Sequence, residues 1–333
     1  MASGAFKHKS FKRSYREDYM RELEVPGMMY HILNTFRLIF KNWKIFLPFL
    51  LIMVLLMIGF VGLMSENTYT EIQNVIDKTA AENNVNIGTF AKSGLLLIST
   101  VFTGGLSANA GAGVGGLVAF LCLIIWLVSI FVIRHRMAGN KITLRDALYN
   151  SLSPLLSTFV VFVVAMLQSI PVMILIIAYS AAIETHFLNT PFYAFLFLVF
   201  AFLMLLLSGY LLSSTIVAMV AVSAPGMYPL EALRTSSEVM RGRRIKFILR
   251  IVALIIALIA MWFIVMMPLI LFDLFMKQFD WTVLVPFIPV CLVIMSCFTG
   301  IYVAVYFYTY YRWILKFDTK EENGKKRSRK KNK

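Results

Sequence analysis

The sequence predicts an all-α polytopic membrane protein with six transmembrane helices, and two observations carry this prediction. The 333 residues are 59% hydrophobic with a mean hydropathy of +0.78, far more apolar than a water-soluble domain. Six apolar blocks approach or exceed the roughly 20 helical residues that are needed to cross a hydrocarbon core. They cover residues 45–64, 116–133, 155–183, 192–222, 247–275 and 283–313.

The distribution of basic residues predicts how these blocks are oriented. Of the 32 Lys and Arg residues, 29 lie in alternate segments along the chain and only 3 lie in the segments between them. Because cytoplasmic segments retain positive charge, we expect both termini in the cytoplasm and the spans in the plasma membrane. The basic segments are residues 1–44, 134–154, 223–250 and 312–333.

Three regions follow from these blocks. Residues 1–27 form a basic N-terminal arm, residues 28–315 the six-helix transmembrane domain, and residues 316–333 a basic tail. The tail is so highly charged that we expect it to be disordered. The outer loop, residues 65–115, ends in a glycine-rich run for which two interpretations stay open. Residues 94–116 form either a re-entrant segment in the outer leaflet or a flexible linker.

A basic amphipathic helix is predicted at residues 28–44, directly before the first span. Apolar residues recur there at helical spacing, while Arg37, Lys41 and Lys44 fall mostly elsewhere on the helical wheel. Such a helix is expected to lie flat in the cytoplasmic interface, where its cations meet lipid phosphates.

The same kind of helix is predicted twice more, at residues 143–152 and 229–241. Thr143 and Asp146 form a capping pattern, and Pro229 suits a first helical turn. The two helices share a sequence pattern, and each precedes a span that contains proline, which predicts three repeated units of an interfacial helix and two spans. The matched residues are Asp146, Ala147, Leu148 and Ser151 against Glu231, Ala232, Leu233 and Ser236, with Leu33 and Thr35 as fainter counterparts of Leu233 and Thr235.

Polar side chains are few inside the predicted spans. Arg250 is close enough to the inner end of the fifth span for its guanidinium to reach the membrane surface. Uncharged polar residues nearer the middle either join helices by hydrogen bonds, which is their commoner use, or line a polar cavity. The candidate lining residues of such a cavity are Gln168, Ser208, Ser213, Thr215 and Asp273.

No arrangement of residues in the sequence points to catalysis. The four histidines are scattered over both sides of the membrane, without a serine or carboxylate pair beside them that suggests a nucleophile or general base. Cys122, Cys291 and Cys297 all lie inside predicted spans, which argues against a disulfide framework or a metal site. We therefore expect no enzymatic activity, no cofactor and no metal.

One stretch resembles a known family. Residues 229–242 read Pro-Leu-Glu-Ala-Leu-Arg-Thr-Ser-Ser-Glu-Val-Met-Arg-Gly and lead into a basic cluster. This resembles the loop before the fifth span in the membrane domain of bacterial glycerophosphodiester phosphodiesterases, and the basic helix before the first span fits the same family. The resemblance implies a six-span membrane component. In those phosphodiesterases the chemistry belongs to a separate soluble barrel, which we do not expect here.

The expected function is that of a non-catalytic multi-pass membrane protein that acts through anionic lipid or protein partners. One alternative is the permease subunit of an ATP-driven exporter, with residues 143–152 and 229–241 as helices that couple to an ATPase subunit. Another is an insertase-like factor whose basic tail binds ribosomal RNA. The residues expected to face lipid or a partner are Arg37, Lys41, Lys44, Glu231, Ser236, Arg241, Arg243, Arg244, Lys325, Lys326 and Arg327.

Overall fold

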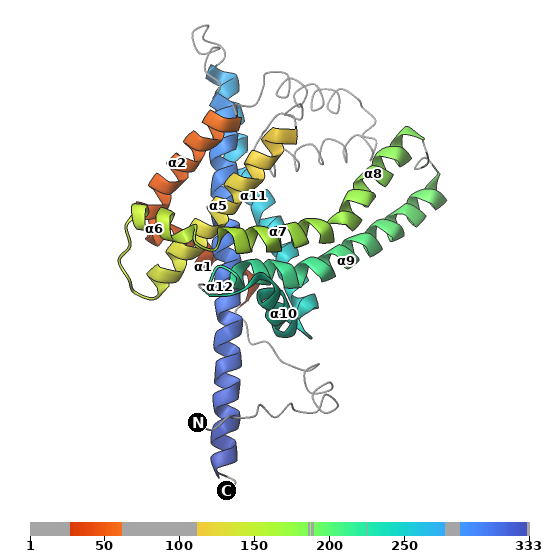
Figure 1. Cartoon of the computed structure of the whole chain (residues 1–333). Helices are drawn as coiled ribbons and strands as arrows, with labels where there is room; N and C mark the ends of the chain where they lie inside the picture. The colour runs from red at the N-terminus through yellow and green to blue at the C-terminus, as the bar shows by residue number, and fades with distance from the viewer. Residues whose placement is uncertain are drawn as a thin grey trace.

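The predicted all-α class is confirmed for the residues that the structure describes. The computed structural model describes residues 27–61, 112–185, 187, 190–224, 226–276 and 287–331, and every regular element within these ranges is a helix (Figure 1). Most of the N-terminal arm and the stretch that could re-enter the membrane lie outside these residues, so both expectations stay predictions.

Five helices are long and apolar enough to cross a membrane. A sixth crossing is counted if a bent pair of helices is taken as one span; this pair is α6 (Leu144–Ser151) and α7 (Leu155–Gln168), bent by 64°. The described residues therefore contain five to six candidate spans. The five are α2 (Trp43–Val61), α5 (Ala112–Met137), α9 (Pro191–Ala221), α11 (Arg244–Met276) and α12 (Phe287–Lys331).

The third predicted span is divided into two helices. α7 ends at Gln168 and α8 (Ile170–Glu184) begins directly after Ser169, whose hydroxyl donates to the carbonyl of Ala165 at 2.9 Å. Pro171 lies in the first turn of α8, and proline has no N–H to bond to the preceding turn, while its ring crowds the carbonyl four residues earlier. Pro268, by contrast, lies inside the continuous helix α11. The break therefore needs local features around Ser169 in addition to a proline.

The long helices form a closed ring in chain order. α2 packs on α5, α5 on α7, α7 on α9, α9 on α11, α11 on α12, and α12 returns to α2. α12 also contacts α5 and α9, and the indole N–H of Trp126 on α5 donates to the carbonyl of Met219 on α9 at 3.3 Å. α5, α9 and α12 thus also contact one another across the ring, and α2, α7 and α11 pack against them from outside.

Three short helices lie apart from one another toward the same end of this ring: α1 (Met28–Lys41), α6 and α10 (Pro229–Met240) (Figure 1). They agree with the predicted interfacial helices to within three residues at each end. The Thr143 hydroxyl accepts the N–H of Asp146 at 3.3 Å, and Pro229 lies in the first turn of α10, as the sequence indicated. We call this end of the ring the basic end, because Arg134 and Arg136 at the end of α5 lie there.

Each short helix buries one side at a spacing of four residues against a long helix. α1 packs on α12, α6 on α5 and α10 on α9. The matched positions of α6 and α10 are buried alike. When Leu33 is aligned with Leu233, Ile32 matches the buried Ala232, whereas the other buried residues of α1 lie one position away from those of α10. The buried residues are Ala147 and Ser151, Ala232 and Ser236 with Met240, and His31, Ile32, Thr35 and Ile39.

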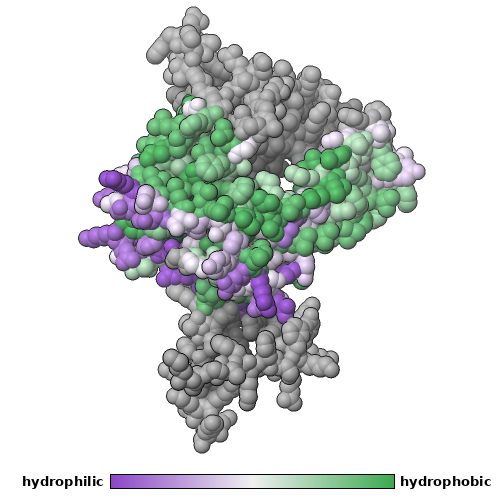
Figure 2. All heavy atoms as spheres, viewed as in Figure 1, coloured by the Kyte–Doolittle hydropathy of each residue, from purple (hydrophilic) through white to green (hydrophobic). Residues whose placement is uncertain are grey.

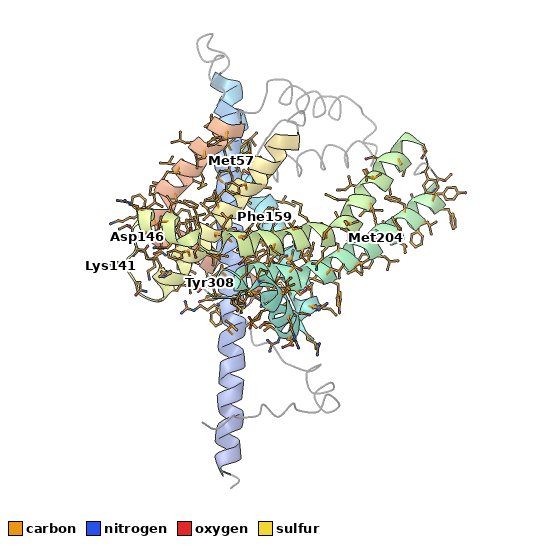
Figure 3. The ribbon with its side chains drawn as sticks, in the orientation of Figure 1. Met57, Lys141, Asp146, Phe159, Met204 and Tyr308 are labelled. Carbon is orange, nitrogen blue, oxygen red and sulfur yellow. The ribbon has the colours of Figure 1, made fainter. Side chains whose placement is uncertain are left out.

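The outer surface of the ring separates apolar from polar residues. Figure 2 shows hydrophobic residues over α2, α8 and α9, and hydrophilic residues gathered toward α6 and α10 at the basic end. α8 and the first half of α9 project from the ring as a hairpin, with large apolar side chains exposed along both helices (Figure 1). In Figure 3, Met57 and Met204 lie in the apolar part, whereas Lys141 and Asp146 lie toward the basic end. Such a surface suits a protein that is surrounded by lipid.

Residues 316–331, in the tail that we expected to be disordered, continue α12 as a helix in the described structure, and the disorder of the tail stays a prediction. A helix that is already formed extends without a new nucleation cost, and Lys and Arg are good helix formers. Glu321 and Glu322 also stand four residues before Lys325 and Lys326, the order that favours a helix. The charge of the tail is therefore compatible with helical structure.

Candidate functional site at the basic end

α1 is attached to α12 by buried polar side chains. His31 is 1% exposed, and its Nε2 lies 3.3 Å from the carbonyl oxygen of Tyr306 and 3.4 Å from Oγ1 of Thr309. Because a carbonyl oxygen only accepts, Nε2 carries the proton of the neutral ring. The hydroxyl of Tyr302 donates to the carbonyl of Ile32 at 3.1 Å. These bonds give the exposed side of α1 a defined orientation.

Arg250 on α11 completes this buried cluster. Its guanidinium carbon lies 5.2 Å from the centre of the Tyr310 ring, within the range of a cation–π contact, and the side chain is 7% exposed. The expectation that Arg250 reaches the membrane surface is therefore wrong, because the aromatic residues of α12 enclose it. Burial lowers the pKa of His31 to about 4; the hydrogen bond to Tyr306 opposes this shift, and the charge of Arg250 adds to it.

The opposite side of α1 is exposed and mixes cationic with apolar side chains. Leu33 and Phe40 are 58% and 63% exposed, and Arg37 lies between them on the same side of the helix. Such a mixture suits the boundary between hydrocarbon and phosphate, where apolar atoms and cations are both favourably placed. We call this surface the α1 face; it consists of Leu33, Arg37, Phe40 and Lys41 on α1, together with the exposed Trp43 and Lys44 at the start of α2.

Two residues that were expected to face lipid or a partner are buried instead. Arg243 is 0% exposed, and Ser236 is 2% exposed. Ser236 follows the buried Ala232 by one turn, so both lie on the side of α10 that packs on α9. The chain turns sharply between α10 and α11 at Gly242, whose φ is 78°, and this turn precedes the enclosed Arg243.

The other expected residues of this corner differ in their surroundings. Arg244 lies over the Tyr210 ring of α9, 4.0 Å from its centre, and donates to the hydroxyl oxygen of Ser237 at 3.4 Å. Glu231 and Arg241 are exposed. The side chains of Lys325, Lys326, Arg327 and Asp273 lie outside the described residues, although the backbone there is helical.

Three of the candidate cavity residues come together where α7 meets α9. The hydroxyl of Thr215 donates to Oε1 of Gln168, and the hydroxyl of Ser208 lies 3.5 Å from the backbone carbonyl of Gln168. That carbonyl is available because the last carbonyls of a helix have no partner within it. Ser213 donates to the carbonyl of Tyr210 within α9 at 2.7 Å. These bonds support the interpretation that the residues join helices.

A polar groove of about 650 Å³ opens at the basic end, between α5, the corner from α6 into α7, and the turn from α9 into α10. No Asp or Glu is among its described lining residues. It therefore offers hydrogen-bond donors and positive charge without a carboxylate to oppose an anion. We call it the basic groove, and its main polar residues are Arg134, His135, Asn150, Ser153, Ser157 and Tyr228.

The donors of the basic groove are largely unused within the described part of the chain. Arg134 donates from one terminal nitrogen to the carbonyl of Ser223 at 3.1 Å, which holds the guanidinium in place and leaves its other N–H groups available. His135 uses Nδ1 toward the carbonyl of Phe131 at 3.0 Å, so Nε2 stays available. The side chains of Ser153 and Ser157 make no hydrogen bond to described residues, nor do those of Asn150 and Tyr228.

Sequence reasoning missed the basic groove and the cluster around His31. The groove combines three segments that lie up to about 90 residues apart in the chain, and no single segment carries a recognisable motif. The only local signal was Arg134 and Arg136 at the end of a span, followed closely by serines in the next corner. The spacing of His31, Thr35 and Ile39 could have suggested a buried side of α1, but not its partner.

Comparison with models of protein families, with curated proteins and with solved structures gives no match for this chain. The resemblance to the membrane domain of glycerophosphodiester phosphodiesterases therefore rests on residues 229–242 and the helix before the first span, and it stays a prediction.

Proposed function

We propose that this protein is a non-catalytic multi-pass membrane protein that binds anionic lipid with its basic end. The α1 face is the single observation that carries the proposal. Three cations and three large apolar side chains are exposed along α1 and the first two residues of α2, while the buried bonds of His31 and Tyr302 attach the other side of α1 to α12. A helix held in this way presents its cations at a constant depth, where lipid phosphates are their nearest partners.

The proposal includes an architecture and an orientation. Six spans form three units, each a short helix followed by two crossings, with α7 and α8 together as the third crossing. The contacts support this division, because each short helix packs on the second crossing of the preceding unit and α1 closes the circle on α12. Both termini lie in the cytoplasm of a bacterial cell, and the charge distribution along the chain supports this orientation.

The experiment measures which lipids the protein retains at its surface. The full-length protein is reconstituted into phosphatidylcholine bilayers, and electron paramagnetic resonance compares spin-labelled phosphatidylglycerol with spin-labelled phosphatidylcholine. We expect a preference for phosphatidylglycerol that weakens as salt rises, because exposed charges are screened. The variant Arg37→Gln/Lys41→Gln/Lys44→Gln should lose most of this preference, since each cation near the surface contributes about 1 kcal/mol.

A matched control separates the α1 face from net charge. Lys78→Gln/Lys92→Gln removes positive charge from the predicted outer loop, and it should keep the wild-type lipid preference. An unchanged preference in the triple variant would contradict the proposal. Stoichiometric co-purification of an ATPase would favour the permease alternative, and co-purification of ribosomes would favour the insertase alternative. Turnover or transport of a substrate by the reconstituted protein alone would favour an enzyme or a carrier.

A further inference from the structure

The basic groove differs from the α1 face in shape as well as in place. The α1 face is a convex helix surface, whereas the basic groove is a recess of about 650 Å³ between three parts of the ring. It lies beside α6 and α10, and α1 contributes none of its lining. The two features can therefore be tested separately.

We propose that the basic groove is a discrete site for the phosphate group of one membrane phospholipid. The inference deepens the proposed function and rests on it in one respect, that the basic end meets lipid headgroups. A general cationic surface attracts many lipids weakly, whereas this recess holds a single headgroup by directed hydrogen bonds.

The available donors fit a phosphate anion. The guanidinium of Arg134 is oriented by its bond to the Ser223 carbonyl, and its remaining N–H groups can donate to phosphate oxygens. The hydroxyls of Ser153 and Ser157 come from the corner where α6 passes into α7 and add neutral donors. A phosphate offers several acceptor oxygens to this set, and the lining contains no described carboxylate that would repel it.

An apolar row on α7 indicates that the ligand carries acyl chains. Val160, Val163 and Leu167 follow Ser157 along α7 and form an exposed strip beside its side of the helix, where Val161 is buried. Their side chains are 41%, 41% and 60% exposed. A phosphate in the groove would thus lie at the start of an exposed row of apolar side chains. This arrangement matches a phospholipid, in which acyl chains extend from the phosphate headgroup. A soluble phosphate would use only the polar part.

The site is tested by native mass spectrometry of the full-length protein in detergent, titrated with dioleoyl phosphatidic acid. We expect one molecule to bind with an affinity at least about tenfold above the following ones, as for hydrogen bonds to a charged group. Ser153→Ala/Ser157→Ala and, separately, Arg134→Gln should each reduce the affinity of the first site about tenfold, and Arg134→Lys should reduce it less.

Three controls make the result decisive. Ser180→Ala removes an exposed hydroxyl of α8 and should leave the first site unchanged, as should Arg37→Gln/Lys41→Gln/Lys44→Gln. Dioleoylglycerol, which lacks the phosphate, should not occupy the site. Unfolding temperatures identify variants that fail to fold, and the double alanine variant removes only two hydroxyls that bond to no described residue.

Three outcomes would overturn the assignment. In the first, wild type and the double alanine variant bind the first phosphatidic acid equally well. In the second, millimolar inorganic phosphate displaces the lipid completely, which shows a soluble anion site without a role for the apolar row. Loss of the first site only in the α1 triple variant would also overturn it, while leaving the proposed lipid function intact.

Discussion

At the scale of single residues, His31 shows how burial sets protonation. Its ring lies between α1 and α12, bonded to the Tyr306 carbonyl and close to Arg250 and the Tyr310 ring. A charged imidazole there would lose water and face a neighbouring guanidinium, so the neutral form is favoured. The docking of α1 is therefore coupled to the protonation state of one side chain.

This coupling predicts that stability falls on acidification. The pKa of His31 is about 4 in the folded protein against 6.5 for the free side chain, so the unfolded chain takes up the proton first. The stabilisation is complete above pH 6.5 and is lost as the pH falls from 6.5 to 4, by on the order of 3 kcal/mol.

The unfolding temperature of the purified protein, measured at steps between pH 7.5 and 4.5, checks this prediction. His31→Gln can still donate a hydrogen bond but does not titrate, so its unfolding temperature should decline less over the same range. If wild type and His31→Gln decline in parallel, another group carries the pH dependence.

At the scale of elements, α5 and α12 approach each other closely at Gly300. A Cβ atom at this position would lie 3.1 Å from Cγ2 of Ile125, closer than ordinary van der Waals contact. Interfaces between transmembrane helices use small residues in this way, because packing rather than exclusion of water brings the helices together. Ile125 is 2% exposed and has little space into which it can move.

Gly300→Leu should therefore lower the stability of the protein by about 1–3 kcal/mol, the usual cost of overpacking. The unfolding temperature in detergent is the measurement, and Ile125→Ala in the same chain should restore part of the loss. Gly59→Leu is the control, because nothing lies within 4 Å of a Cβ at that position. Equal losses in the two leucine variants would show that contact with α5 does not set the cost, because leucine favours a helix more than glycine does at both positions.

The elements that could be predicted from the sequence are those set by local signals. Apolar length located α2, α5, α9 and α11, and the pattern of Thr143 with Asp146 located the start of α6. The misses depend on contacts between distant segments. Arg243 and Arg250 carry charge and were expected at a surface, but the packing of α10 on α9 and of α11 on α12 encloses them. The basic groove was missed for the same reason, since its three parts meet only in the folded ring.

At the scale of the whole molecule, the ring brings every short helix to one end. The same end carries Arg134 and Arg136 from α5, and α12 continues beyond the ring there toward Lys331 (Figure 1). Translocating so many cations would be unfavourable, so we expect the basic end to face the cytoplasm. The proposed lipid sites are consistent with this orientation, because anionic headgroups of the cytoplasmic leaflet would meet the α1 face and the basic groove together.

The orientation is tested by cysteine labelling in intact bacterial cells. The chain first needs Cys122, Cys291 and Cys297 replaced by alanine, so that the introduced thiol is the only one present. Asn83→Cys lies in the long segment between α2 and α5, and Gly324→Cys lies on the extension of α12. A maleimide that cannot cross membranes should label the first variant in intact cells and the second only after lysis. Labelling of Gly324→Cys in intact cells, with Asn83→Cys protected, would reverse the orientation and place the α1 face and the basic groove on the outer side, away from the cytoplasmic leaflet.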